Sequence, residues 1–130
     1  MKAYWDTSAL VEATTDLALR ARVQRERPFT RTHSLAEAFS ALTGGNLGIR
    51  VDADDAAATL SDLAGDLQFV DLDKADVLTA FKSARRKGVR GGRVHDYLHA
   101  VSAEKEKATQ IVTLDRNDFT GLTSLKVEQL

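Results

Sequence analysis

The sequence predicts an α/β fold in which helices cover both faces of a mostly parallel sheet. Short apolar runs, typical of buried strands, alternate with segments whose apolar residues recur every three or four positions, as in amphipathic helices. The first run stops at Asp6, two hydroxyl residues follow, and a helical pattern begins at once. A length of 130 residues, with 43% apolar and 28% charged residues, suits one soluble domain spanning 1–130.

The first half of the chain shows two expected strands and four expected helices. The strands lie at 2–5 and 29–32, and the helices at 9–13, 17–24, 35–42 and 53–63. Asp16 has the position of a capping residue for the second helix. Gly44-Gly45 ends the third helix, and Asn46-Leu47-Gly48 continues the loop.

The second half continues the alternation. We expect a strand at 67–70, a helix opened by Leu72-Asp73, a glycine-rich loop, a helix at 94–106, a strand at 110–114, a turn at 115–119 and an edge strand at 125–127. In the first of these helices Val77, Leu78, Phe81 and Ala84 form an apolar stripe.

Charge is divided unevenly, although the net charge is only −1. Residues 84–94 contain Arg85, Arg86, Lys87, Arg90 and Arg93 and no acid, whereas residues 51–76 are rich in aspartate. A polyanionic partner could therefore bind at one face. The absence of cysteine excludes disulfides and thiolate metal sites and fits a reducing cytoplasm. We find no signal-peptide pattern and no apolar stretch long enough to span a membrane.

The candidate functional residues are acids, and each also has an ordinary structural explanation. Asp6 can cap the helix after it. Ser34 and Glu37 have the spacing of a capping box, and the helical angle places Glu37 away from the face of Leu35, Phe39 and Leu42.

The later acids are ambiguous in the same way. Asp96 lies in a first helical turn, where an acid offsets the helix dipole. Asp115 or Asp118 can stabilise the turn that contains them.

The common placement of these acids gives the stronger indication. Asp6 and Asp115 follow apolar strands at the edge where parallel sheets bind ligands, and helix starts carrying Glu37 and Asp96 face the same edge. Converging carboxylates repel one another unless a cation lies among them, and oxygen ligands suit Mg²⁺ or Mn²⁺. Such an ion can activate water for phosphodiester hydrolysis.

Four segments in order resemble PIN-domain ribonucleases of the VapC toxin type. They are 4–11 (YWDTSALV), 35–39 (LAEAF), 94–100 (VHDYLHA) and 111–119 (IVTLDRNDF). The resemblance implies a three-layer α/β/α sandwich with a central mostly parallel sheet. It also implies a Mg²⁺- or Mn²⁺-dependent endoribonuclease that acts on RNA as a homodimer and is blocked by a cognate antitoxin.

The resemblance also implies roles for single residues. The acidic set would be Asp6, Glu37, Asp96 and Asp115, with Asp6 and Asp96 as the most direct metal ligands. Asp118 is a second candidate for the fourth acid. Ser8 and Thr113 fall where the family often places supporting hydroxyls.

The basic residues at positions 85, 86, 87, 90 and 93 have two interpretations. They form either a solvated helix end or a set of phosphate contacts that guide RNA to the acids, and we favour the second. His95 and His99 imitate a zinc-protease pattern, but the chain offers no convincing third ligand, so partial exposure or packing of His99 near the core is expected.

Two other functions remain open. One is a PIN-shaped binding module without catalysis. The other is a phosphatase of the haloacid-dehalogenase type, for which Ser8 stands where a second aspartate is wanted.

Overall fold

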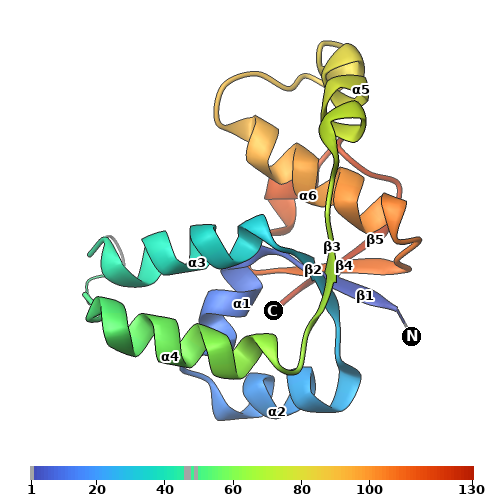
Figure 1. Ribbon diagram of the computed structural model, residues 1–130. Coiled ribbons are helices and arrows are strands. Elements are labelled where there is room, and N and C mark those ends of the chain that lie inside the picture. The colour runs from blue at the N-terminus through green and yellow to red at the C-terminus, as the bar shows by residue number, and fades with distance from the viewer. Residues whose placement is uncertain (1, 46–47, 49) are drawn as a thin grey trace.

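The fold is built on a parallel sheet with helices on both of its faces (Figure 1). The computed structural model describes residues 2–45, 48 and 50–130. The strands are β1 (Ala3–Trp5), β2 (Phe29–Arg31), β3 (Gln68–Val70), β4 (Gln110–Thr113) and β5 (Lys126–Gln129). They pair in the order β3-β2-β1-β4-β5, and every pairing is parallel. The carboxyl ends of the strands therefore share one edge, with β1 at the centre.

The helices occur in the predicted order. They are α1 (Thr7–Ala13), α2 (Leu17–Glu26), α3 (His33–Thr43), α4 (Ala53–Ala64), α5 (Lys74–Ala84) and α6 (Arg93–Lys105), with a short 3₁₀ helix, η1, at Arg116–Phe119. The loop predicted at Asn46 and Leu47 lies outside the described residues. No described helix has the length and hydropathy needed to cross a bilayer.

Two apolar cores, one on each face of the sheet, confirm the predicted three-layer α/β/α arrangement. Trp5 packs with residues of α1, α2, α3 and α4, whereas its neighbour Tyr4 packs with α5, α6 and η1. Successive residues of a strand point to opposite faces, which explains how adjacent aromatic residues serve separate cores. Both side chains are fully buried, as strand packing requires.

The predicted caps of α2 and α5 are confirmed. The Asp16 side chain accepts a hydrogen bond from the backbone N–H of Leu19. Asp73 and Asp76 form a reciprocal capping box at the start of α5. In both cases an aspartate satisfies backbone donors that have no partner within the first helical turn.

The capping box predicted for α3 is wrong. The helix begins at His33 after an N-cap at Thr32, so Ser34 lies inside the helix rather than at its cap. Ser34 is buried, and its Oγ accepts a hydrogen bond from the Thr30 hydroxyl at 2.8 Å. The inward face of α3 is Ser34, Ala38 and Leu42, whereas Phe39 is 37% exposed. Glu37 is thereby released from the helix terminus and can reach other elements.

The apolar stripe of α5 is only partly covered. Ala80 is buried, but Leu78 and Phe81 are each about half exposed. The amino end of α5 is tied to α6 by an ion pair of 2.6 Å between Lys105 and Asp76. In Figure 1 this helix stands at the top of the molecule, beyond α6.

Candidate active site

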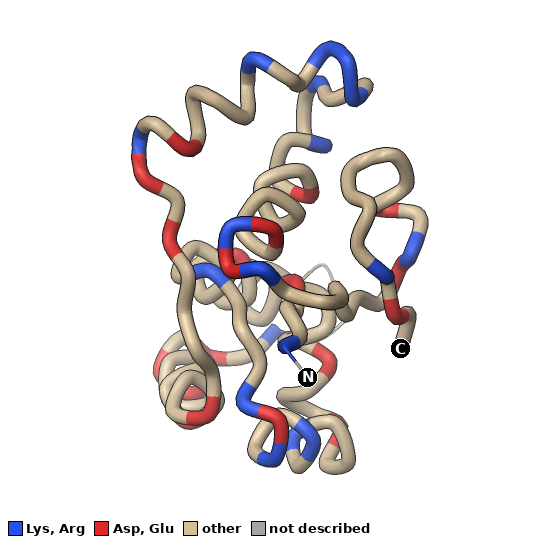
Figure 2. The backbone as a smooth tube through the Cα atoms, turned by 90° about the vertical axis from the view of Figure 1, so that its right-hand side faces the viewer, with Lys and Arg blue, Asp and Glu red and all other residues tan. Residues whose placement is uncertain are grey.

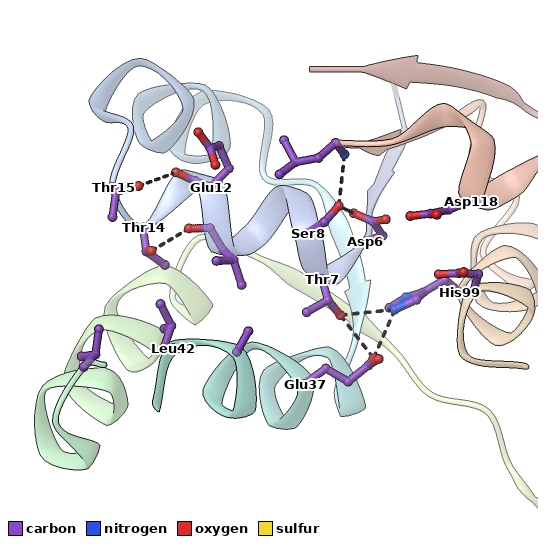
Figure 3. Close-up of a pocket in the computed structure, with 15 residues that line it drawn as sticks. Asp6, Thr7, Ser8, Glu12, Thr14, Thr15, Glu37, Leu42, His99 and Asp118 are labelled. Carbon is purple, nitrogen blue, oxygen red and sulfur yellow. Dashed lines mark hydrogen bonds and ion pairs between the residues drawn. The ribbon is translucent and has the colours of Figure 1, made fainter. Parts of the chain in front are cut away.

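A pocket of about 620 Å³ opens at the carboxyl edge of the sheet. It is lined by four of the acids singled out in the sequence, namely Asp6, Glu37, Asp96 and Asp118 (Figure 3). They come from the end of β1, from α3, from the first turn of α6 and from η1. Its other end is lined by apolar side chains, among them Val11, Leu42 and Val51.

Asp6 is buried at the start of α1 and held by three donors. Its Oδ1 accepts hydrogen bonds from the backbone N–H of Ala9 at 3.0 Å and from the hydroxyl of Ser8 at 2.7 Å, while Oδ2 accepts one from Thr113 at 2.6 Å. The residue is thus a helix cap, as its position predicted, and it also lines the pocket. A carboxylate has about four acceptor positions, so Oδ2 keeps capacity for a further ligand.

The two hydroxyl residues that support Asp6 also bind the backbone at the end of β4, and Ser8 thereby joins the start of α1 to it. The Ser8 Oγ accepts a hydrogen bond from the backbone N–H of Leu114 at 3.0 Å, and the Thr113 Oγ1 accepts one from that of Asp115 at 3.3 Å. These contacts fix the rotamers of both hydroxyls, and through them the carboxylate of Asp6.

Glu37 points across the pocket mouth from α3 toward α1 and α6 (Figure 3). Its Oε1 accepts a hydrogen bond from the Thr7 hydroxyl at 3.2 Å and lies 3.1 Å from Nε2 of His99. Burial raises the pKa of Glu37, but the contacts with His99 and Thr7 and the nearby charge of Arg31 outweigh it, so the pKa is lowered overall. Glu37 thus lies in the pocket with the other acids, as its inclusion in the predicted acidic set requires.

Asp96 and Asp118 both line the pocket, and the charge of Asp118 acts on Asp96. Burial, together with the charges of Asp118 and Asp6, raises the pKa of Asp96 to about 6. Burial, Asp115 and Asp6 likewise raise the pKa of Asp118. Arg93 opposes the shift in both cases. The site therefore holds more negative charge than its own cations neutralise.

Asp115, the other candidate for the fourth acid, does not line this pocket. It is exposed and caps η1, where its Oδ1 accepts a hydrogen bond from the backbone N–H of Asn117 at 2.9 Å. The structure thus brings Asp118, rather than Asp115, to the pocket with the other three acids.

Arg93, the last of the basic residues at 85–93, lies near the acids of the pocket, because its charge opposes the rise in pKa of both Asp96 and Asp118. Arg93 begins α6 and donates a hydrogen bond to the backbone carbonyl of Thr120. In the part of the chain that the structure describes, no ion pair involves residues 85–93, whereas Arg20, Arg22 and Arg27 of α2 and its cap all bind acids. Figure 2 shows one group of Lys and Arg positions at the top of the molecule and others in its middle and at its lower end.

The donor set of the pocket suits a hard divalent cation. All four acids offer oxygen. The pKa of Asp96 is raised first by burial and then by the carboxylates around it, whose repulsion a cation would offset. Within the described ranges, no three acidic or histidine side chains are close enough to enclose an ion. Mg²⁺ is commonly held by one or two carboxylates and several waters, and this open arrangement fits that mode.

The structure also shows contacts that the sequence analysis missed. Thr7 and His99 join Glu37 in a hydrogen-bonded group, and His99 is 2% exposed, whereas His95 is exposed. The two histidines therefore share no ligand site. The spacing of His99, three residues after Asp96, was a usable signal, because such residues lie on the same side of a helix.

Comparison with known proteins agrees with this architecture. The structure is similar to PAE2754 from Pyrobaculum aerophilum, with a TM-score of 0.70 at 18% identity, covering 98% of this chain and 89% of that one. It is similar to VapBC2 from Rickettsia felis bound to a DNA fragment from their promoter (TM-score 0.74, 18% identity, 100% and 99% covered). VapBC-1 from nontypeable Haemophilus influenzae gives a TM-score of 0.68 at 16% identity, with 99% and 98% covered.

At the sequence level, no curated protein matches the chain. A model of the PIN domain family matches residues 3–122, which include every acid of the pocket. The chain therefore belongs to the PIN domain family.

Proposed function

We propose that this protein is a metal-dependent endoribonuclease and the toxin of a type II toxin–antitoxin pair. The observation that supports this most is the meeting of Asp6, Glu37, Asp96 and Asp118 in one pocket at the edge of a parallel sheet. Membership of the PIN family and the similarity to VapBC structures agree with a nuclease toxin.

Each acid has a role in this proposal. Asp6, held by three donors, and Asp96 would be the direct ligands of Mg²⁺ or Mn²⁺. Glu37 and Asp118 would bind through water or orient the attacking water. When bound, the ion supplies an activated water and stabilises charge on a phosphoryl oxygen. Attack of the water oxygen on phosphorus, with release of the 3′-oxygen, would leave a 5′-phosphate and a 3′-hydroxyl.

We further propose that RNA approaches from the α5–α6 loop. Residues Arg85, Arg86, Lys87, Arg90 and Arg93 lack acidic partners among the described residues. In the chain they lead directly into the first turn of α6, which carries Asp96. Phosphates favour such cations, and the aspartates of α4 repel them.

We also propose two binding partners for the protein, an antitoxin and a second copy of the chain. An antitoxin segment would cover the pocket and place apolar side chains at its end near Val11, Leu42 and Val51. The protein itself would act as a homodimer in the cytoplasm.

Cleavage of a labelled RNA, with EDTA and then with added Mn²⁺, tests the proposal. We expect metal-dependent cleavage, with 5′-phosphate ends, that Asp6→Asn reduces at least about a hundredfold. Asp16→Asn is the matched control, because it changes another helix cap to a residue that caps equally well. Full activity of Asp6→Asn would refute the ligand assignment. RNA binding without cleavage would favour a binding module, and hydrolysis of small phosphoesters alone would favour a phosphatase.

A further inference from the structure

A buried hydrogen-bonded group connects the elements that carry the acids of the pocket. Its members are Tyr4 of β1, Thr7 of α1, Glu37 of α3 and His99 of α6. Tyr4 and Thr7 flank Asp6 in the chain, and His99 follows Asp96 by one helical turn. The group therefore joins β1 and the three helices that position Asp6, Glu37 and Asp96. Figure 3 shows the contacts among Thr7, Glu37 and His99.

The partners of His99 determine which of its ring nitrogens carries the proton. Nε2 faces Oε1 of Glu37 at 3.1 Å, and an ionised carboxylate can only accept, so Nε2 must donate. Nδ1 of a neutral ring is then an acceptor, and it lies 2.7 Å from the hydroxyl of Tyr4. Tyr4 is fully buried and stays protonated, so its O–H donates to Nδ1.

The same contacts leave one oxygen of Glu37 for the pocket. Both Thr7 and His99 lie on Oε1, and among the described residues Oε2 has no hydrogen-bond partner. A glutamate side chain loses rotamer entropy when it is held in one conformation. Because Thr7 and His99 already hold Glu37 before a ligand binds, ligand binding does not have to bear this entropy loss. A carboxylate held through one oxygen presents the other in a constant direction.

The burial of His99 shows that its polarity serves these contacts. At 2% exposure, an imidazole loses its hydration, and only its hydrogen bonds compensate for this loss. An aliphatic side chain would fill a similar volume without this cost. The edge-on packing of the ring against Tyr4, with centroids 5.8 Å apart, also restricts its rotation.

We propose that His99, held by Tyr4, is a positioning residue that fixes the carboxylate of Glu37 in the pocket. His99 acts on the reaction through Glu37 and does not itself touch the substrate. The kinetic consequence rests on the proposed nuclease function, whereas the consequence for cation binding and the state of the ring do not.

Two amide substitutions of His99 separate positioning from packing. His99→Gln places an N–H donor near the position of Nε2 and can reach Glu37, whereas His99→Asn is shorter and reaches only toward Tyr4. We expect His99→Asn to weaken Mn²⁺ binding, measured by calorimetry, about tenfold or more and to lower kcat similarly with little change in KM. His99→Gln should retain most of both. His95→Gln and His95→Asn, on the exposed side of α6, are the matched controls.

Ring nitrogen NMR of the parental protein gives a readout that needs neither RNA nor a variant of His99. The parental protein should show a protonated Nε2 and an unprotonated Nδ1 in His99, and Tyr4→Phe should change the Nδ1 signal. A proton on Nδ1, or equal losses in the two amide variants at equal thermal stability, would overturn the proposal. Failure of the parental protein to cut RNA would instead refute the proposed function, and the inference would still be decided by the NMR and Mn²⁺ results.

Discussion

At the scale of single residues, structural and functional roles coincide rather than compete. Asp6 caps α1 through the N–H of Ala9 and at the same time lines the pocket. A capping aspartate must sit at a helix start, and in a parallel sheet that start lies at the ligand-binding edge. Its structural explanation is therefore correct and does not weaken the functional one.

Asp118 and Asp115 offer a direct comparison of two acids only three residues apart. We expect Asp118→Asn to reduce RNA cleavage at least about tenfold, because this carboxylate lines the pocket and is coupled to Asp6. Asp115→Asn should change the rate little, since Asn can still accept the hydrogen bond that caps η1. Initial rates at saturating Mn²⁺ measure both. A larger loss of cleavage rate in the Asp115 variant than in the Asp118 variant would show that Asp115 is the fourth acid of the site.

Asp96 carries a stability cost at neutral pH. Its pKa of about 6 is above the ordinary value, so the folded protein binds this proton more tightly than the unfolded chain does. The loss of folding stability is absent below about pH 4, where Asp96 is protonated in both states. It grows as pH rises toward 6 and is complete above the folded pKa of about 6. Asp96→Asn should therefore stabilise the metal-free protein by about 1 kcal/mol at pH 8, allowing for solvent screening of a half-buried group.

Denaturant unfolding in EDTA at pH 8 and at pH 4 measures the effect of Asp96→Asn. The gain should disappear at the lower pH, where the parental carboxyl is protonated. An equal gain at both pH values would mean that charge is not its cause. The variant would lose cleavage while gaining stability, as is common for sites that concentrate like charge.

At the scale of elements, α2 is fastened to the last strand. Arg22 forms two hydrogen bonds to Glu128 of β5, at 2.6 and 2.9 Å, and its guanidinium lies 5.4 Å from the centre of the Trp5 ring. The hydrogen bond from Arg22 lowers the pKa of Glu128, so this ion pair stabilises the fold above the ordinary pKa of glutamate, and its contribution disappears as pH falls.

Breaking this ion pair should loosen β5. We expect Arg22→Met, which keeps the apolar stem, to lower the free energy of unfolding by about 2 kcal/mol at pH 7. The effect should shrink as pH falls through the lowered pKa of Glu128, where the carboxylate of the parental protein takes up a proton. Glu128→Gln and the double variant complete a double-mutant cycle measured in urea. A coupling energy near zero would show that the two side chains act independently.

The elements also show where sequence patterns stop being informative. Capping residues of α2 and α5 were predicted because their signals are local. The start of α3 was misplaced because Ser34 bonds to Thr30 of the neighbouring strand rather than to its own helix. The contacts of Glu37 reach Thr7 and His99, which are far from it in the chain, and no periodicity reveals such pairs.

At the scale of the whole molecule, the fold was the most predictable property. Alternating strands and helices with right-handed parallel connections allow few arrangements, and the resemblance selected one of them. The choice between Asp115 and Asp118 was not predictable, since it depends on which side of η1 meets the pocket. A turn of four residues has too little periodicity to show this.

The uneven distribution of charge should control how RNA binds to the whole molecule. Replacing Arg85, Arg86, Lys87 and Arg90 with glutamine should raise KM for RNA and leave kcat nearly unchanged, because these residues lie outside the pocket. The slope of log affinity against log salt should become shallower by about 0.7 for each phosphate of a single strand that the variant no longer neutralises. Competition binding with the inactive Asp6→Asn background measures this slope between low and moderate salt.

Two exposed cations at the opposite edge of the sheet provide the control for this charge effect. Arg25 in the last turn of α2 and Lys107 before β4 are exposed and precede strands rather than follow them. Their replacement by glutamine lowers the net charge but leaves the α5–α6 loop intact, so affinity and salt slope should change little. The loop variant for this comparison replaces only Arg85 and Arg86, so that both variants lose two charges. If the two variants reduced affinity equally, RNA would be responding to net charge alone. A loss confined to the loop variants would place the path of the strand beside Asp96.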